Sequence, residues 1–293
     1  MSNKLRICLL ISGALGFDAL VHLYKKHSII CVFTDWQSKE IIHFSKENNI
    51  SLIIGNLKSK SAETWQSVRC DLLLSVNYLF IINEDLISIA KHAINIHGSL
   101  LPKYRGRTPH VWAIINGEKK TGVTVHCIDK GVDSGDIIIQ KEINIEENDS
   151  GAAILIKFKE LYPHLINELL EKILTNSIKF EAQNHSNATY FGKRTPESGL
   201  VNWDWFRERI RDWIRAQTDP YPGAFFFYDG IKVTVHQAVF SNLGMNAETA
   251  NGTILEVNKI MNELIVKTPN GCITLKNLRC ERKIDFKINT ILT

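Results

Sequence analysis

Residues 5–35, LRICLLISGALGFDALVHLYKKHSIICVFTD, contain an apolar β-branched run, an amphipathic segment and a second apolar run. This order predicts a strand, a helix and a parallel strand, because parallel strands need a crossover that is usually helical. Gly13 and Gly16 make the first loop resemble a dinucleotide-binding turn, but the full GxGxxG spacing is missing. The stretch therefore predicts a βαβ unit and does not predict NAD binding.

The same alternation continues along the chain. It comprises KEIIHFSKENN (39–49), ISLIIG (50–55), SAETWQSVR (61–69), CDLLLSVN (70–77), EDLISIAKH (84–92) and AINIHG (93–98). Two further strand candidates, TGVTVHCID (121–129) and DIIIQKEINI (136–145), follow a short helix at 111–116 and precede an amphipathic segment at 152–174. Buried strands that alternate with helices predict a doubly wound, Rossmann-like, mainly parallel α/β sheet.

The texture changes after about residue 177. The polar segment QNHSNATYFGKRTPESG (183–199) is typical of a surface linker, and the Trp-rich segment 203–217 predicts a helix. Five short alternating strands are expected after it, AFFFY (224–228), KVTVHQAVF (232–240), GTILEV (252–257), ELIVKTP (263–269) and CITLKNL (272–278). We expect a catalytic domain at 1–185, a linker at 186–204, and a helix with a small oligonucleotide-binding-like (OB-like) β-barrel at 205–293.

Composition favours an ordinary globular protein. The net charge of +4 over 293 residues is too small and too evenly spread to predict nucleic-acid binding. The six cysteines form no CxxC pair, which predicts reduced core residues, no metal site and a cytoplasmic protein. No apolar run approaches the roughly 20 residues of a membrane span, and ICLLIS is too short for a signal peptide. A homodimer is the base-rate expectation.

Polar side chains gather in INIHGSLLPKYRGRTPHVWAI, residues 94–114. Asn95 and His97 alternate along a strand and therefore share one face. Ligands of open parallel sheets bind beyond the carboxyl ends of the strands, so this pair is a candidate for one cleft. The alternative for His97 is a hydrogen-bonded histidine in the packing.

Charged residues follow on two loops. Lys103, Arg105 and Arg107 suit a carboxylate or a phosphate, or lie in a solvated loop. In the turn after residue 128, Asp129 either bonds the local backbone or faces the cleft. Asp133 is better placed to orient an imidazole.

Several motifs in this order carry a family resemblance. Asn95, His97, SLLPKYRG, TPHVWAIINGE, TGVTVHCID and VDSGDIII resemble the core signature of the folate-dependent formyltransferases. That family includes methionyl-tRNA formyltransferase, glycinamide ribonucleotide formyltransferase and the sugar N-formyltransferases of bacterial surface polysaccharide pathways. ATYFGKRTPESGLVNW and TDPYPGAF resemble the linker and second domain of the sugar and tRNA branches, so the resemblance covers nearly the whole chain.

The resemblance implies a catalytic trio of Asn95, His97 and Asp133. In this hypothesis protonated His97 and the Asn95 amide donate hydrogen bonds to the developing oxyanion, and Asp133 fixes the imidazole and raises its pKa. The co-substrate is 10-formyltetrahydrofolate, without a metal. Its implied contacts are Leu79, Phe80, Ile81, Arg107, Asp129, Lys130, Gly131 and Val132.

For the formyl acceptor, the resemblance favours the sugar branch. The tRNA enzymes carry a basic insertion after the second strand, whereas TDWQSKEIIHF (34–44) passes straight into the next helix. We expect dTDP-4-amino-4,6-dideoxyglucose or its 3-amino analogue, used in surface polysaccharide (lipopolysaccharide O-antigen) synthesis. Candidate acceptor contacts are Asn77, Tyr78, Arg105, Lys193, Arg194 and Tyr221.

Other functions stay open from the sequence. Methionyl-tRNA is the alternative acceptor, and hydrolysis of formyl-folate is the alternative reaction. A nucleic-acid-binding module on the C-terminal barrel is disfavoured, because single-strand binders stack bases on aromatic side chains and only Phe286 follows Phe240 among the aromatic residues. The tryptophans at 203, 205 and 213 could stack on a base, but such a cluster more often fills a core.

Overall fold

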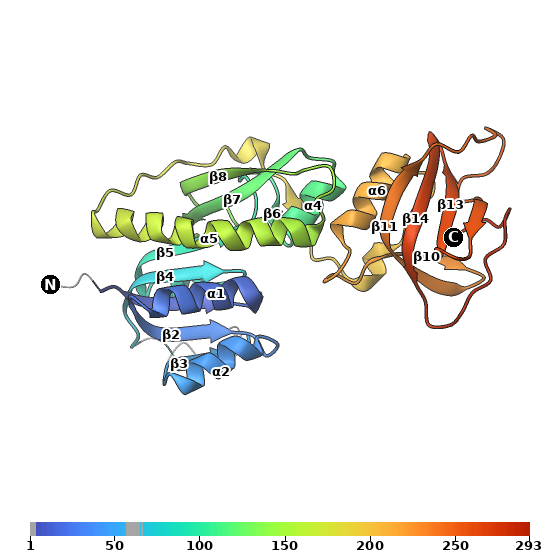
Figure 1. Ribbon diagram of the computed structural model, residues 1–293. Helices are drawn as coiled ribbons and strands as arrows, with labels where there is room; N and C mark the ends of the chain where they lie inside the picture. The colour runs from blue at the N-terminus through green and yellow to red at the C-terminus, as the bar shows by residue number, and fades with distance from the viewer. Residues whose placement is uncertain (1–3, 57–64, 66) are drawn as a thin grey trace. The chain divides into compact units, whose positions relative to one another are not determined.

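A computed structural model, which describes residues 4–56, 65 and 67–293, folds the first part of the chain into a seven-stranded sheet (Figure 1). In chain order its elements are β1 (Arg6–Ile11), α1 (Gly13–Tyr24), β2 (Ser28–Thr34), α2 (Lys39–Glu47), β3 (Ser51–Ile54), β4 (Cys70–Val76), α3 (Glu84–Ile87), β5 (Ala90–His97), β6 (Arg105–Gly106), α4 (Pro109–Ile115), β7 (Lys120–Cys127), β8 (Ile137–Asn144) and α5 (Gly151–Leu174). The strand order is β3-β2-β1-β4-β5-β7-β8. The first five strands pair in parallel and β7 pairs antiparallel with β5, which confirms the predicted Rossmann-like fold.

Apolar burial on both faces explains why β1 lies inside the sheet. Residues Ile7–Ile11 are all fully buried, so side chains that point to opposite faces are covered equally. On α1, Gly16 lies so close to the strand that a Cβ would approach the Cβ of Ile11 to 2.9 Å. Gly13 has a positive φ of 61° at the strand-to-helix turn. Both glycines of this loop therefore have a packing or backbone role without a dinucleotide.

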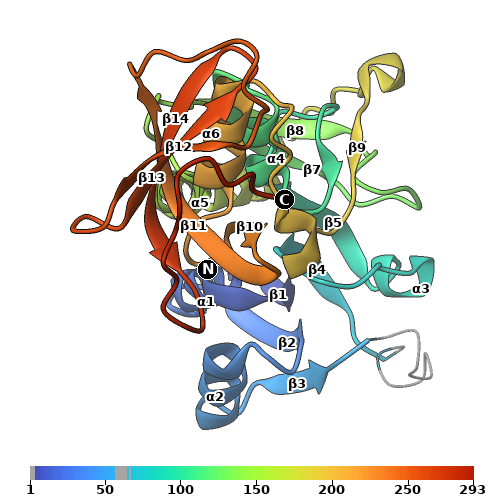
Figure 2. The same ribbon diagram turned by 90° about the vertical axis from the view of Figure 1, so that its right-hand side faces the viewer.

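The last part of the chain forms an antiparallel sheet. In chain order its elements are the 3-10 helix η3 (His185–Asn187), β9 (Tyr190–Phe191), the 3-10 helix η4 (Pro196–Gly199), α6 (Arg207–Ala216), β10 (Ala224–Tyr228), β11 (Ile231–Ser241), β12 (Ile254–Asn258), β13 (Glu263–Thr268) and β14 (Gly271–Arg279). The order β10-β11-β14-β13-β12 leaves β10 and β12 as the outer strands (Figure 2).

Residues 289–293 bond to both of these outer strands. Thr293 exchanges two backbone hydrogen bonds with Phe227 of β10, and Asn289 and Thr290 pair with Ile254 of β12. This tail satisfies backbone groups that an open sheet would expose at both edges. The arrangement is a small barrel-like sheet, which agrees with the predicted architecture of the C-terminal domain.

Two compact units divide the described chain. The first consists of the chain up to Gly106 together with Gly122–Ile143 and Lys157–Tyr190. The second consists of Arg107–Thr121, Asn144–Ile156 and Phe191–Thr293. The second unit thus includes α4, a helix that the sequence pattern groups with the preceding sheet. Within the described residues, no helix is long and apolar enough to cross a membrane.

Two segments differ from the sequence pattern for local reasons. The segment 84–92 gives only the short helix α3, because β5 already begins at Ala90 and pairs His92 with Leu72 of β4. The Trp-rich helix begins at Arg207 rather than at residue 203, because the Asn202 side chain accepts a hydrogen bond from the Asp204 N–H and holds a turn there. Of the amphipathic segment expected at 61–69, residues 61–64 and 66 lie outside the described residues.

The cysteines follow the prediction in part. All six are free, and Cys8, Cys31, Cys70 and Cys272 are buried. Cys8, Cys31 and Cys70 belong to one hydrophobic cluster on the sheet with Phe33 and Trp65. Cys280, by contrast, is exposed and is not a core residue.

Candidate active site

The candidate site lies at the carboxyl end of β5. Asn95 and His97 alternate on this strand, and the antiparallel register of β7 places His126 opposite Asn95. The loop between β7 and β8 brings Asp133 to the same place, where its carboxylate lies 3.4 Å from Asn95 Nδ2 and 3.5 Å from His97 Nδ1. The structure therefore brings together the three residues predicted as catalytic, and it adds His126.

His97 has one ring nitrogen fixed and one that can change its protonation. Its Nε2 lies 2.8 Å from the backbone oxygen of Tyr104, and because a carbonyl only accepts, Nε2–H donates this bond. The neutral ring then carries its lone pair on Nδ1, which faces Asp133. A proton taken up by His97 therefore binds at Nδ1 and gains a carboxylate neighbour.

Asp133 is held in an unusual backbone conformation. Its φ is 52°, in the left-handed region that few non-glycine residues adopt. One carboxylate oxygen accepts a 2.9 Å hydrogen bond from the Gly106 N–H, and the other lies 3.6 Å from His126 Nε2. A left-handed residue with a part-buried carboxylate is the kind of strained position that recurs at functional sites.

The Asn95 carboxamide is oriented by its neighbours. His126 Nδ1–H donates to the Cys127 carbonyl at 2.8 Å, so in the neutral ring Nε2 is an acceptor. This Nε2 accepts a 3.1 Å hydrogen bond from Asn95 Nδ2. The second Nδ2 hydrogen has only the 3.4 Å contact to Asp133, which is long for a hydrogen bond.

Burial and charge set the protonation states of the central pair. Burial lowers the pKa of His97, and the opposing effect of the Asp133 carboxylate does not cancel it. Burial raises the pKa of Asp133, but His97, His126 and the Gly106 N–H outweigh it and hold this pKa below its ordinary value. The resting pair is thus a neutral imidazole beside an ionised carboxylate. The expected effect of Asp133, which favours the charged ring, is present, but burial outweighs it and the net shift of the His97 pKa is downward.

The cluster is suited to proton transfer. It combines a neutral imidazole, a carboxylate that can stabilise the imidazolium, and an amide donor. Within the described ranges, no group of three or more His, Cys, Asp or Glu is arranged to hold a metal ion.

Apart from Arg107, the residues predicted to bind the folate lie on two loops. Leu79, Phe80 and Ile81 follow β4, and Ile81 is 65% exposed. In the turn 129–132, Lys130 and Gly131 are exposed and Val132 is 50% exposed. Both loops thus present an exposed apolar side chain, and their contact with the folate stays a prediction. Asp129 itself bonds Gly131 N–H and the Ser134 hydroxyl, which is the local turn role weighed from the sequence.

Two predicted acceptor contacts, Asn77 and Tyr78, directly follow β4. Asn77 follows β4 with a positive φ of 55° and donates to the Ser12 carbonyl at 3.1 Å. Tyr78 packs edge-on against Phe80, and burial raises the pKa of its phenol. These residues lie where the strand order reverses between β1 and β4, the usual ligand position of such sheets.

Arg105 differs from the other candidates because it is only 1% exposed. Its guanidinium donates to Gln183, His185 and Tyr190 within the first unit. The structure therefore does not place this side chain for contact with an acceptor. The role of Gln183 was not visible in the sequence, because it lies in a polar segment typical of a linker.

The remaining predicted contacts belong to the second unit. Arg107 is half-buried and Lys193 is exposed. The Arg194 guanidinium lies over the rings of Trp112 and Trp213, and Tyr221 hydrogen-bonds to His110. Arg194 and Tyr221 therefore have packing partners of their own.

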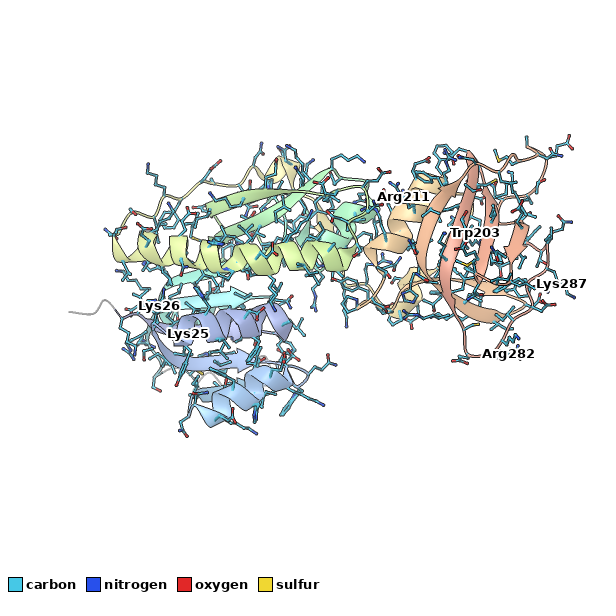
Figure 3. All side chains as sticks on the ribbon, in the orientation of Figure 1. Lys25, Lys26, Trp203, Arg211, Arg282 and Lys287 are labelled. Atoms are coloured by element: carbon cyan, nitrogen blue, oxygen red, sulfur yellow. The ribbon has the colours of Figure 1, made fainter. Side chains whose placement is uncertain are left out.

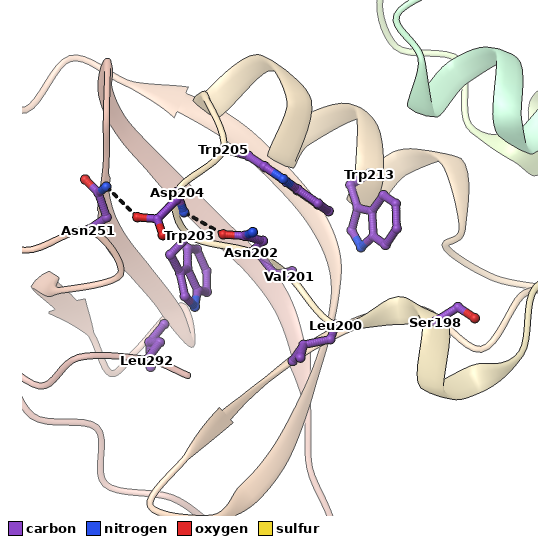
Figure 4. Close-up of a pocket in the computed structure, with 10 residues that line it drawn as sticks. All are labelled: Ser198, Leu200, Val201, Asn202, Trp203, Asp204, Trp205, Trp213, Asn251 and Leu292. Carbon is purple, nitrogen blue, oxygen red and sulfur yellow. Dashed lines mark hydrogen bonds between the residues drawn. The ribbon is translucent and has the colours of Figure 1, made fainter.

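The second unit also contains a pocket of about 540 Å³ (Figure 4). Its lining consists of Ser198, Leu200, Val201, Asn202, Trp203, Asp204, Trp205, Trp213, Asn251 and Leu292. Trp203 and Trp213 are 7% and 8% exposed, and Arg209 covers the ring of Trp205. Trp203 and Trp213 are therefore core residues, as the sequence favoured, whereas Trp205 is only partly buried.

Several basic side chains of the described residues are exposed. Lys25 and Lys26 follow α1, and Arg282 and Lys287 lie beyond β14, all exposed on their own units (Figure 3). Arg211 of α6 is bonded to Glu147 and lies over Phe240. The nucleic-acid alternative gains no support from these groups.

Comparison with known proteins identifies the family. Residues 19–170 match the model described as formyl transferase, and residues 193–293 match the formyl transferase C-terminal domain. The chain belongs to the formyl transferase family. This confirms the resemblance seen in the sequence, and the two matches together span most of the chain.

Individual relatives differ in length and chemistry. The bifunctional polymyxin resistance protein ArnA of Wigglesworthia glossinidia brevipalpis is 34% identical over 260 residues, which are 85% of this chain but 39% of that protein. An N-formyltransferase from Helicobacter canadensis, in complex with folinic acid and dTDP-3-aminofucose, has a TM-score of 0.72 at 19% identity and covers 93% of this chain and 99% of its own. A 4-N formyltransferase from Francisella tularensis has a TM-score of 0.68 at 26% identity, covering 79% and 96%.

Proposed function

We propose that this protein transfers the formyl group of 10-formyltetrahydrofolate to the amino group of a nucleotide-linked amino-deoxy sugar. The observation that carries the proposal is the cluster of Asn95, His97 and Asp133 at the end of β5, in a chain of the formyl transferase family. The folate supplies the formyl group as a co-substrate. The folinic acid and dTDP-3-aminofucose in the complex of the Helicobacter canadensis N-formyltransferase support the two ligands.

His97 acts as the proton carrier in this mechanism. Its neutral Nδ1 takes a proton from the attacking amine, and the Asp133 carboxylate 3.5 Å away stabilises the imidazolium. The proton then passes to the folate nitrogen as its bond to the formyl carbon breaks. The Tyr104 carbonyl keeps Nε2–H occupied, so the ring does not need to change tautomer during the cycle.

Asn95 supports the charge that develops on the formyl oxygen. Its Nδ2 hydrogen toward His126 is well bonded, whereas the one toward Asp133 is held at 3.4 Å. The formyl oxygen takes the place of the Asp133 carboxylate and accepts a hydrogen bond from Asn95 Nδ2. Such a donor is worth about a hundredfold in rate or more, because it is positioned before the charge appears.

The acceptor is inferred to be dTDP-4-amino-4,6-dideoxyglucose or its 3-amino analogue, for surface polysaccharide synthesis. Only residues 35–38 separate β2 from α2, so the chain has no room there for the basic insertion of the tRNA branch. Asn77 and Tyr78 lie at the end of β4 and are proposed to contact the sugar, while the loops 79–81 and 129–132 hold the folate.

Turnover with defined acceptors tests this proposal. The enzyme is incubated with 10-formyltetrahydrofolate and, in parallel, with dTDP- and UDP-linked amino sugars, with charged initiator tRNA, and with water alone. Tetrahydrofolate release and acceptor mass are followed together. We expect a gain of one formyl group on a dTDP-amino sugar in step with folate release. Formylation of tRNA alone, or folate release without a formylated acceptor, would contradict the proposal.

A further inference from the structure

Gln183 is a buried side chain whose amide has a fixed orientation. It is 6% exposed, and its Nε2 lies 3.0 Å from the Asp133 carbonyl and 2.6 Å from the Gly135 carbonyl. Its Oε1 lies 2.6 Å from Nη2 and 3.2 Å from Nε of Arg105. Because carbonyls only accept and a guanidinium only donates, no flipped amide fits these partners. Gln183 therefore bonds the Asp133 loop on one side and Arg105 on the other.

Arg105 extends the connection to the loop that holds His97. Its side chain is buried and donates further bonds to Tyr190 Oη and His185 Nδ1. Its backbone N–H donates to the Thr189 carbonyl, and the N–H of Tyr104 donates to the Thr189 hydroxyl, each at 2.8 Å. The segment Gln183–Tyr190, which we call the strap, thus fixes residues 104–106 through the side chain and the backbone.

The two anchored loops are the ones that orient the proposed catalytic pair. The Tyr104 carbonyl accepts from His97, and the Gly106 N–H donates to Asp133. Asp133 lies in a turn with a left-handed φ, so no regular ladder of backbone hydrogen bonds fixes its position. The bonds from Gln183 to the carbonyls of residues 133 and 135 replace that ladder.

We propose that Gln183 is a positioning residue, which holds the Asp133 loop against the 104–106 loop so that Asp133 and His97 keep their mutual geometry. Gln183 touches neither substrate nor the reacting atoms and acts through Asp133 and Arg105. The inference rests on the proposed function, since it presumes that His97 and Asp133 carry the reaction.

Gln217 of the second unit provides a matched control. It is 5% exposed, its Oε1 accepts a 2.9 Å bond from Arg194, and its Nε2 donates a 2.9 Å bond to the Trp213 carbonyl. Gln217 therefore resembles Gln183 in being buried, in accepting from an arginine and in donating to a backbone carbonyl. That carbonyl, however, belongs to helix α6 and not to the candidate site.

The experiment compares Gln183→Leu, Gln183→Glu and Gln217→Leu with wild type and Asp133→Asn. Leucine removes every hydrogen bond of the glutamine. Glutamate keeps an acceptor for Arg105 but presents an oxygen to the two carbonyls. For each protein kcat, thermal unfolding and the NMR titration midpoint of the His97 ring are measured on the full chain.

We expect both Gln183 variants to lose about a hundredfold in kcat, the typical cost of displacing a reacting group by about 1 Å. The midpoint of His97 should move to lower pH, because Asp133 no longer lies beside the ring. Gln217→Leu should unfold at a lower temperature as Gln183→Leu does, with kcat and the midpoint of His97 unchanged.

Two results separate the possible failures. If Asp133→Asn keeps its turnover, the proposed function is wrong at its catalytic residues. If Asp133→Asn loses turnover while the folded Gln183 variants stay within twofold of wild type, the positioning role is overturned. An equal loss of kcat in Gln217→Leu also overturns it, because the effect would then reflect general destabilisation. Should Gln183→Leu fail to fold, Gln183→Glu alone decides.

Discussion

Two polar clusters, one around Asp133 in the first unit and one around Arg194 in the second, differ in the length of their contacts. At the end of β5, the contacts that Asp133 makes with Asn95, His97 and His126 are 3.4–3.6 Å long, and Asp133 has a left-handed backbone. In the second unit, Arg194 lies 4.4 Å from the ring centre of Trp213 and donates hydrogen bonds of 2.7 and 2.9 Å.

This difference separates a reactive arrangement from a structural one. The short bonds of Arg194 Nη2 to the Ser198 carbonyl and to Gln217 join parts of the second unit and stabilise its fold. Long contacts around Asp133 leave hydrogen-bonding capacity that a substrate can use, at the cost of some backbone strain. Substitutions in the first cluster should therefore change turnover, and those in the second should change stability.

The largest expected effect is that of His97→Ala. Removing the proton carrier should lower kcat by about 10²–10⁴-fold, the range for general acid–base groups. Product mass and tetrahydrofolate release measure the loss. His43→Ala, which removes an exposed histidine from α2 in the same unit, should retain wild-type turnover. Near-wild-type turnover of His97→Ala would show that the cluster at the end of β5 does not carry the reaction.

A smaller loss is expected for Asn95→Ala. Its amide is proposed to donate one hydrogen bond to the negative charge that develops on the formyl oxygen. Losing this donor should lower kcat by about a hundredfold. KM for the folate should change little, since the apolar loops carry that contact. Asn48→Ala serves as the control, because Asn48 caps the end of α2 through the Phe44 carbonyl. A raised KM with unchanged kcat would assign Asn95 to ground-state binding instead.

The sequence predicted the fold well where periodicity is strong. The runs at 5–35 and the barrel strand AFFFY gave their elements nearly to the residue, because apolar alternation reports burial directly. Asn95 and His97 could be predicted as a pair for a similar reason, because side chains two residues apart on a strand point to the same face.

Long-range partners were out of reach. His126 became part of the site only through the antiparallel pairing of β5 with β7, and its sequence context is that of any strand histidine. Gln183 lies in a polar segment whose composition is typical of a linker, although the side chain is buried. The sequence shows that Asp133 can raise the pKa of His97, but it does not show the burial that outweighs this effect.

A titration of His97 tests its electrostatic interaction with Asp133. The folded pKa of His97 should lie below the ordinary value of about 6.5, because burial disfavours the charged ring. Asp133→Asn should lower the midpoint further, since the carboxylate favours the imidazolium. NMR of the histidine ring protons measures both proteins without substrate. His236 of the second unit should titrate identically in the two. A midpoint that rises in Asp133→Asn would show that the carboxylate does not face Nδ1.

The smallest effect on catalysis is expected for Arg194→Met, which also tests the candidate role of Arg194 in acceptor binding. Methionine keeps much of the apolar volume between the indoles but removes the charge and the bonds to the Ser198 carbonyl and Gln217. Stability should fall by about 1–3 kcal/mol, the usual value of charged hydrogen bonds with a cation–π contact. Denaturant unfolding measures this loss, while kcat and KM for the amino sugar should stay within twofold. A selective rise in KM at unchanged stability would instead show that the guanidinium contacts the acceptor. The cluster around Arg194 would then serve substrate binding and not stability alone.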